Sequence, residues 1–363
     1  GRLSRYHYAT PAYELILSWL AILVKCRHNG LNDNYFRELR IHRGLVMLLA
    51  LTPNPSIDRT LVVPGFRHAE VTRATQRHDA AGGKGLNVAR IARTIGLPVL
   101  ACAPLGGETG QQINILAMNE GIDTCWFWMA EGESRICLLI NDLQAHDTLV
   151  INEPGPYMSA DDWAGFALLV RQQAAAASGV SFSGSLMPGV EQDWFRRLVA
   201  ELLVDGRTIF IDTSGAPLRT AIDLPVALIK VNAHELGDAL GRQITNAEQA
   251  VIAGREILER GPQAVIVTLG KDGAIAVDRT GAWIARTEPI TVVSPVGSGD
   301  AVLTGTVCML LRGRSLSEAL RMGVACGAAN ALTLGGGVIR PSDLERLLMG
   351  SELHAIDDLE DSF

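Results

Sequence analysis

The sequence predicts an α/β protein built on a mainly parallel β-sheet that helices cover on both faces. From Met47 onward, short apolar runs of strand length alternate with longer runs of helical periodicity. This alternation is typical of parallel sheets, because each helix returns the chain to the edge where the next strand begins. Two regions lack intervening helices and predict, in addition, a small antiparallel β-sheet that can cover a substrate site as a lid.

The individual elements follow from apolar periodicity and from glycines at helix ends. The main-sheet strands are expected at residues 48–51, 99–103, 179–183, 208–212, 227–231, 264–269 and 273–277. Helices are expected at 84–95, 108–120, 160–177, 191–203, 233–240, 247–260, 301–311, 316–334 and 341–348. The lid strands are expected at 60–63, 73–78, 124–129, 135–140 and 148–151.

Composition limits the classes of function. The chain has 363 residues, of which 48% are hydrophobic, enough for a substantial core. Its net charge of −7 gives no electrostatic reason to bind nucleic acid or an anionic membrane, so local positive groups must hold any anionic substrate. None of the six cysteines forms a C-x-x-C pair, so we expect reduced thiols in a cytoplasmic protein, without disulfides or zinc.

Residues 1–46 do not continue the pattern. Their apolar run at 15–24 is about half the length that spans a bilayer, and no small-residue cleavage site follows it. We interpret 1–46 as an N-terminal extension outside the fold, with Met47 as a natural initiator. An amphipathic or anchoring helix is the alternative.

The stretch leading into the helix at 301–311 carries the strongest chemical signal. An apolar run at 291–293 predicts a short strand, and Gly297, Ser298 and Gly299 form a turn before the helix. Such a turn presents backbone N–H groups and the positive end of a helix dipole, which together bind anions and above all phosphate. Glycine allows the close approach, because no Cβ stands in the way.

Asp300 lies where that helix opens. A capping carboxylate is the ordinary interpretation of this position. Beside a phosphate cradle, however, a carboxylate can also take the proton from an attacking hydroxyl while the N–H groups hold the charge on a transferred phosphoryl group. The dinucleotide fingerprint would need glycine at Val302, and no G-x-x-x-x-G-K-[ST] motif occurs, so the phosphate site belongs to another fold.

A glycine-dense loop before the first helix is the second strong stretch. Gly82 and Gly83 let the backbone close on a sugar, while Lys84 and Asn87 offer a cation and an amide at the helix start. Asp58 follows the first strand, where a carboxylate can accept hydrogen bonds from two sugar hydroxyls. An ordinary loop-to-helix junction and a turn-capping aspartate are the alternatives.

Polar residues follow several other strands. Asn232 and Glu235 stand three apart and share a face of the first helical turn. Glu235 can hold a hydrated Mg²⁺ through water and Asn232 can contact phosphate, although the same pair is also typical of a capping box. The remaining candidates are the strand-end residues Ser183, Thr268, Gly270 and Gly273, and Arg135 at the start of a lid strand.

Taken together, these motifs resemble the ribokinase-like sugar kinases, above all their hexose-phosphate branch, the 1-phosphofructokinase and tagatose-6-phosphate kinase group. The likeness rests on Asn54-Pro-Ser-Ile-Asp58, Gly82-Gly-Lys-Gly-Leu-Asn87, Ser183-Gly-Ser-Leu, Asp212-Thr-Ser-Gly, Lys230-x-Asn-x-x-Glu235 and Gly297-Ser-Gly-Asp300. It implies a three-layer ribokinase-like domain over residues 47–350, with lid strands from about 59–79 and 124–151. Residues 351–363 are left as an acidic tail.

The resemblance also implies transfer of the ATP γ-phosphoryl group to a hexose phosphate, with Mg²⁺, and allows a homodimer through the lid. Asp300 would be the catalytic base, and Gly297, Ser298 and Gly299 the anion hole. Asp58, Gly82, Gly83, Asn87 and Ser183 would hold the sugar, and Lys84 and Arg135 would neutralise its phosphate. Lys230, Asn232, Glu235, Thr268, Gly270 and Gly273 would serve ATP and Mg²⁺, with Glu235 at the metal through water.

The sequence departs from the family pattern at four positions. Val231 replaces a usual proline and Ser298 a usual alanine, and in the lid Ser134 and Cys137 replace a usual threonine and asparagine. The loss of an amide at Cys137 bears on sugar preference more than on phosphate binding. Two alternatives stay open: a kinase for an unphosphorylated sugar or nucleoside, which Lys84 and Arg135 argue against, and a non-catalytic sugar-phosphate sensor, which Asp300 argues against.

Overall fold

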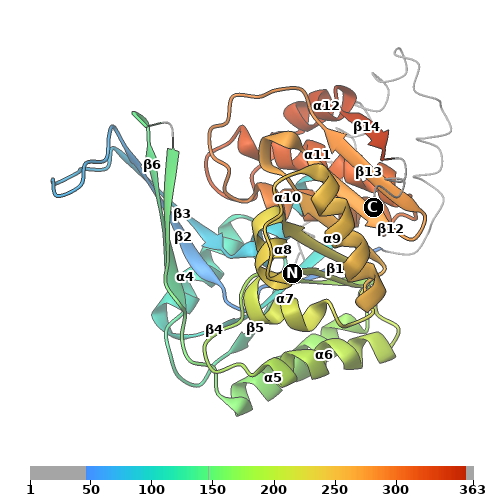
Figure 1. Ribbon diagram of the computed structural model, residues 1–363. Helices are drawn as coiled ribbons and strands as arrows, with labels where there is room; N and C mark the ends of the chain where they lie inside the picture. Colours follow the sequence, from blue (N-terminus) through green and yellow to red (C-terminus); the bar gives the residue numbers. More distant parts are fainter. Residues whose placement is uncertain (1–45, 146, 357–363) are drawn as a thin grey trace, which may run out of the picture. The chain divides into compact units, whose positions relative to one another are not determined.

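The computed structural model describes residues 46–145 and 147–356, so the predicted extension lies almost entirely outside the described residues. Within them, the main sheet has ten strands (Figure 1). In spatial order these are β14 (Glu352–Ala355), β13 (Gly281–Arg286), β12 (Ala274–Asp278), β11 (Ala264–Thr268), β10 (Leu228–Asn232), β9 (Ile209–Asp212), β8 (Gly179–Ser183), β1 (Leu48–Leu51), β4 (Val99–Leu105) and β5 (Thr124–Trp128).

The strands from β11 to β5 are parallel, and β12, β13 and β14 are added antiparallel at one edge. The central strands are buried on both faces, which explains why β1 and β9 have nearly continuous apolar sequences. Successive side chains of β1 enter opposite cores: Leu48 belongs to one hydrophobic cluster and Leu49 to the other.

Helices supply the two outer layers. The core that contains Leu48 is closed by α3 (Lys84–Thr94), α4 (Gly107–Asn119), α10 (Ser298–Leu310), α11 (Leu316–Ala331) and α12 (Pro341–Met349). The core that contains Leu49 is closed by α5 (Ala160–Ala174), α6 (Gln192–Val204), α7 (Gly215–Ala221), α8 (Ala233–Leu240) and α9 (Ala247–Arg260). The predicted three-layer α/β architecture is therefore confirmed. No helix in the described part of the chain is long and apolar enough to cross a membrane.

A second sheet forms the lid. Its strands, in spatial order, are β3 (Gln76–Gly82), β2 (Ser56–Val63), β6 (Arg135–Asp142) and β7 (Asp147–Asn152), of which β2, β3 and β6 stand together on the left of Figure 1. The prediction of a purely antiparallel lid is wrong, because β2 and β6 pair in parallel. These two strands come from separate excursions of the chain, and the main-sheet unit β4-α4-β5 lies between them in sequence.

Three further expectations are corrected. The segment expected as a lid strand at 124–129 is β5 of the main sheet, because α4 returns the chain parallel to β4. Residues 291–293 form no strand: Val292 and Val293 are about half exposed, and Pro289 and Pro295 flank them without N–H groups to donate. The fold also continues past residue 350, since β14 pairs with β13. Periodicity predicted neither of these two strands.

Candidate active site

A cavity of about 1150 Å³ opens where the carboxyl ends of β10 and β11 face the lid. Parallel sheets bind ligands at this edge, because the loops after the strands converge there. The predicted site residues that line the cavity are Asp58, Gly83, Lys84, Asn87, Arg135, Lys230, Asn232, Glu235, Thr268, Gly270, Gly273, Gly297, Ser298, Gly299 and Asp300. Segments more than 200 residues apart in the sequence thus contribute to one site.

Two predicted residues do not line this cavity. Ser183 is fully buried at the end of β8, and the residues after it, Gly184 and Ser185, face the cavity instead. Gly82 lies behind Asp58, where an added Cβ would come within 2.1 Å of the carboxylate Oδ1. Gly82 therefore makes room for Asp58 and does not line the cavity itself.

The turn before α10 is tightly packed. Gly297 is the N-cap of α10 in the left-handed conformation, with φ of 81°, and no side chain caps the helix. A Cβ on Gly297 would lie 2.7 Å from Gly337 N, and a Cβ on Gly299 would lie 2.5 Å from the Lys230 Nζ. An ammonium group therefore lies directly beside the backbone of the turn, which favours an anion there. Ser298 N closes the turn through a long bond of 3.2 Å to Pro295 O.

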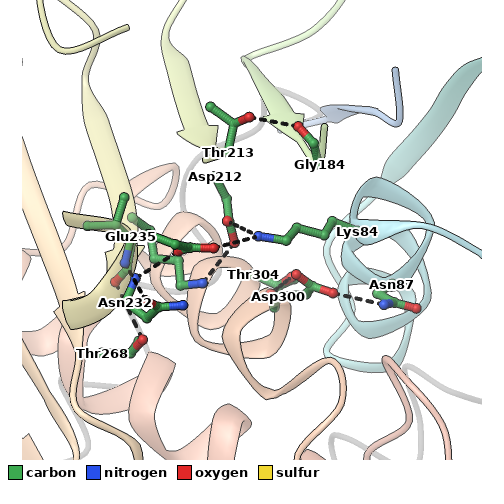
Figure 2. A network of polar contacts seen from close by, with 12 residues as sticks. Lys84, Asn87, Gly184, Asp212, Thr213, Asn232, Glu235, Thr268, Asp300 and Thr304 are labelled. Atoms are coloured by element: carbon green, nitrogen blue, oxygen red, sulfur yellow. Dashed lines mark hydrogen bonds and ion pairs between the residues drawn. The ribbon is translucent and has the colours of Figure 1, made fainter. Parts of the chain in front are cut away.

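Asp300 lies in the first turn of α10 and is only 5% exposed. Its Oδ2 accepts a hydrogen bond of 2.8 Å from Asn87 Nδ2 (Figure 2). Burial, and secondly the negative charge of Asp212, raise the pKa of Asp300 to about 6, against the opposing charges of Lys84 and Lys230 and the Asn87 hydrogen bond. A base with a pKa near neutrality is well matched to general base catalysis.

Asp212 holds two lysines together at the end of β9. Its Oδ1 accepts from Lys84 Nζ at 2.6 Å (Figure 2). Its Oδ2 accepts from Lys230 Nζ at 2.9 Å. Burial opposes ionisation of this fully buried carboxyl, but the two ammonium groups outweigh burial and lower its pKa. The motif Asp212-Thr-Ser-Gly was noted in the sequence, yet nothing in it indicated that Asp212 bridges two cations.

Lys84 contacts acidic groups of the cavity. Besides Asp212, its Nζ lies 3.8 Å from Glu235 Oε1. Burial works against the charged ammonium, but Asp212, Asp300 and Glu235 together raise the pKa of Lys84, so it stays protonated. Its ammonium thus lies on the same side of the cavity as the carboxyl of Asp300, close to the predicted ATP residues.

The predicted nucleotide residues lie on the loops after β10 and β11. Asn232 and Glu235 form the capping box of α8: Glu235 N donates to Asn232 Oδ1 at 2.8 Å, and Asn232 N donates to Glu235 Oε2 at 3.0 Å. The capping interpretation is thus confirmed, and the second Glu235 oxygen still faces the cavity. Thr268 ends β11, followed by the tight turn of Gly270 and Gly273.

The described residues contain no cluster of three or more His, Cys, Asp or Glu side chains able to hold a metal. A pre-formed metal cage is therefore absent from this part of the chain. Mg²⁺ commonly keeps several waters and binds through one or two carboxylates together with substrate phosphates. The single cavity-facing oxygen of Glu235 fits that mode of binding.

The predicted sugar-binding residues Asp58 and Arg135 lie on the lid strands β2 and β6. Asp58 accepts a hydrogen bond of 2.6 Å from Ser56 Oγ, and burial raises its pKa against that bond and the charges of Arg90 and Arg135. Arg135 donates from Nη1 to Glu153 O at 2.8 Å and from Nη2 to Asn54 O at 3.0 Å. Its Nε is buried without a partner among the described residues. Cys137 lies beside Asp58 in the register of the two strands.

Comparison with known proteins decides the family. The model of the pfkB family carbohydrate kinases matches residues 47–342. The chain belongs to this family. It is a carbohydrate kinase, an enzyme that transfers a phosphoryl group to an alcohol, and kinases of this family use ATP.

Relatives of this pfkB family kinase include two phosphofructokinases. A 1-phosphofructokinase of Bacillus subtilis is 30% identical over 79% of this chain and 93% of its own length. An ATP-dependent 6-phosphofructokinase isozyme 2 of Mycobacterium tuberculosis is 32% identical over 84% of this chain and 89% of its own. The structure of Escherichia coli phosphofructokinase-2 with substrates and products is similar, with a TM-score of 0.77 at 27% identity over 84% of this chain and 99% of that one.

Proposed function

We propose that this kinase phosphorylates a hexose phosphate to a hexose bisphosphate at the expense of ATP, as a 1-phosphofructokinase or a tagatose-6-phosphate kinase does. The observation that carries the proposal is one cavity that joins Asp300 and the Gly297 turn to Asp58 and Arg135. A base, an anion cradle, a sugar-binding carboxylate and a guanidinium are the groups that this reaction needs.

Asp300 acts as the general base in this scheme. Its carboxylate takes the proton of the acceptor hydroxyl as that oxygen attacks the γ-phosphorus of ATP. A new O–P bond forms, the bond from the γ-phosphorus to the β,γ-bridging oxygen breaks, and ADP leaves. The charge on the transferred group is stabilised by the backbone of Gly297, Ser298 and Gly299 and by the Lys230 ammonium. These groups lie together at the N-terminus of α10.

Arg135 is the residue that distinguishes a sugar phosphate from a free sugar. Its guanidinium lies on the lid strand β6, near Asp58, and keeps a buried Nε unpartnered in the described structure. Arg135 therefore has a donor to spare for a phosphate oxygen. Lys84 provides a second cation, which Asp212 positions beside the reacting groups. An uncharged sugar or nucleoside has no phosphate for Arg135 to bind.

Glu235 would hold Mg²⁺ through water, while Asn232, Thr268, Gly270 and Gly273 would surround the nucleotide. The metal would neutralise charge on the ATP phosphates. Glu235→Gln keeps the capping acceptor, so it is expected to raise the Mg²⁺ concentration needed for half-maximal rate without unfolding α8. An unchanged Mg²⁺ dependence would argue against this role.

The lid offers a surface for a homodimer. Leu149 and Ile151 of the edge strand β7 are 48% and 50% exposed. Exposed apolar edges of this kind favour pairing with another copy. Ile151→Lys should shift the mass measured by light scattering from dimer to monomer, whereas Val204→Lys, on α6, should leave it unchanged. A monomeric wild-type enzyme would contradict the proposal.

The decisive experiment is a substrate panel with coupled detection of ADP. Fructose 1-phosphate, fructose 6-phosphate, tagatose 6-phosphate and the free sugars are compared at equal concentration. We expect turnover with at least one hexose phosphate and far less with every free sugar. Preference for a free sugar would favour the plain sugar kinase, and no ADP formation with any acceptor would favour the non-catalytic sensor.

A further inference from the structure

Arg90 occupies a central place in the packing behind the catalytic carboxyl. It lies on α3, one turn after Asn87, and its side chain is 13% exposed. Its Nε donates to Glu120 Oε2 at 2.7 Å and its Nη2 to Ala81 O at 2.6 Å. Arg90 is not among the residues that line the cavity. Arg90 therefore acts on the site through its charge, which opposes the rise in the pKa of Asp58, and through the residues that it contacts.

The first neighbour is Asn87. An asparagine amide has one accepting end and one donating end. Arg90 Nη1 donates to Asn87 Oδ1 at 2.8 Å, and the other end, Nδ2, donates to Asp300 Oδ2 at 2.8 Å. If the amide turned over, its NH₂ group would face the donors of Arg90 and its oxygen would face the carboxylate. Arg90 thus determines which end of Asn87 meets the catalytic base.

The second neighbour is the glycine loop at 335–337. Arg90 Nη1 also donates to Gly336 O at 3.0 Å. A Cβ on Gly336 would come within 2.8 Å of Asn87 Nδ2, so this loop presses directly on the amide. On its other side, the loop touches the N-cap of α10, because a Cβ on Gly297 would lie 2.8 Å from Gly336 Cα. The Arg90 guanidinium therefore supports both the Asn87 amide, which contacts Asp300, and the 335–337 loop, which packs behind the Gly297 turn.

We propose that Arg90 is a positioning residue for phosphoryl transfer, which holds the Asn87 amide toward Asp300 and the 335–337 loop against the Gly297 turn. This inference rests on the proposed role of Asp300 as the base. It adds a residue that touches neither substrate and that the sequence motifs did not single out.

The groups around Asp300 determine what loss of Arg90 should do. Asp212 raises the pKa of Asp300, whereas Lys84, Lys230 and the Asn87 hydrogen bond lower it. Without Arg90 the amide is free to turn, and Asp300 loses the donor that stabilises its charged form. The pKa of Asp300 then rises. Because the base must be deprotonated to act, the fall in kcat on the acid side should begin at a higher pH.

The test compares Arg90→Met, Arg90→Lys and a matched control on the same helix. Arg93 is one turn further along α3 and donates from Nη1 to Glu120 O at 2.6 Å, but no contact joins it to Asn87 or Gly336 in the described structure. We expect Arg90→Met to lower kcat by about 10- to 100-fold, as loss of a supporting partner does, and to move the acid limb upward by about one pH unit. Arg90→Lys, which keeps a donor, should restore most of both, and Arg93→Met should change neither.

A double mutant tests the route through Asn87. Asn87→Ala removes the amide, so Arg90→Met should move the acid limb no further in the Asn87→Ala background. An unmoved acid limb in Arg90→Met, or an equal loss in Arg93→Met, would overturn the inference. Arg90→Leu, which likewise has no donor, takes its place in both comparisons if the Met variant does not fold.

Asp300→Asn is measured beside these variants to separate the two proposals. If Asp300→Asn is inactive and Arg90→Met has the wild-type pH profile, only the positioning role fails. If Asp300→Asn turns over at nearly the wild-type rate, the assignment of the base fails, and the positioning role fails with it.

Discussion

The floor of the cavity, where Lys84, Lys230 and Asp300 lie, differs from the lid above it. On the floor, the charged side chains are held by hydrogen bonds and ion pairs, whereas on the lid a hydrogen-bond donor has no partner in the described structure. Asp300 accepts from Asn87, and Asp212 lies between Lys84 and Lys230. In the lid, Arg135 keeps a buried Nε that has no partner within residues 46–145 and 147–356, and the edge strand β7 exposes Leu149 and Ile151. A prearranged floor favours a single chemistry, because groups fixed before the reaction need no reorganisation. A lid with spare donors is suited to recognition of the acceptor.

The largest effect should follow from a change on the floor. Asp300→Asn removes the proton acceptor but keeps the shape of the side chain. We expect kcat to fall by about 10²- to 10⁴-fold, the usual contribution of a general base, with little change in ATP affinity measured by calorimetry. Asp238→Asn, on the exposed side of α8, serves as the control and should keep wild-type turnover. A parallel loss of ATP affinity would mean that Asp300 is structural.

A change in the lid should weaken binding of the hexose phosphate. Arg135→Met is expected to raise the KM for the hexose phosphate by about 10- to 100-fold, because loss of a hydrogen bond to a charged group costs about 1.5–3 kcal/mol. The same variant should leave the KM for ATP and the weak reaction with free sugar nearly unchanged. Arg279→Met, after β12 and away from the cavity lining, is the matched control. Equal losses for phosphorylated and free sugar would remove the distinction between floor and lid.

The floor should also set the pH dependence. The pKa of Asp300 is raised to about 6, so its carboxylate is the dominant form above that pH and is lost as the pH falls through it. The kcat profile of the wild type should therefore decline on the acid side near pH 6, by about tenfold per unit below the pKa. Arg135→Met should leave this limb in place, since Arg135 is not among the groups that shift Asp300. A flat profile between pH 5 and 7 would contradict the assignment.

The same contrast explains what sequence reasoning could reach. The Gly297 turn, Asp300 and the capping box of Asn232 are local patterns, in which a few consecutive residues determine the geometry. The structure confirms that Asp300 lies in the first turn of α10 after the Gly297 turn, and that Asn232 and Glu235 form a capping box. The bridging of Lys84 and Lys230 by Asp212 joins the end of β9 to the start of α3 and the middle of β10, and no local spacing encodes it.

The wrong predictions for individual segments also arise because tertiary contacts are not encoded in local sequence patterns. The strand-like run of β5 could belong to either sheet, and only the crossover through α4 assigns it to the main one. Residues 291–293 are apolar enough for a strand, but the tertiary environment gives Val293 N an isolated partner, Ala331 O, in place of a ladder. Ser183 stands at a strand end as expected, yet the alternation of side chains along β8 turns it inward. Pairing partners and facing directions depend on the assembled sheet.

The smallest effect should come from Cys137, which tests whether the lid discriminates between sugars. Cys137 is 5% exposed, lines the cavity and stands opposite Asp58 across the β2–β6 pair. Burial raises the pKa of its thiol, so it is a neutral and weak hydrogen-bond donor. Cys137→Asn adds a strong hydrogen-bond donor beside Asp58, the carboxylate proposed to bind the sugar.

We therefore expect Cys137→Asn to change the ratio of kcat/KM between two hexose phosphates by about three- to tenfold, the range of one net hydrogen bond, while kcat with the better substrate stays near wild type. Cys125→Ser, on β5 and outside the cavity lining, should leave the ratio unchanged. A large fall in kcat for every acceptor would place Cys137 with the floor, because recognition groups alter the choice of acceptor whereas floor groups alter the transfer step itself.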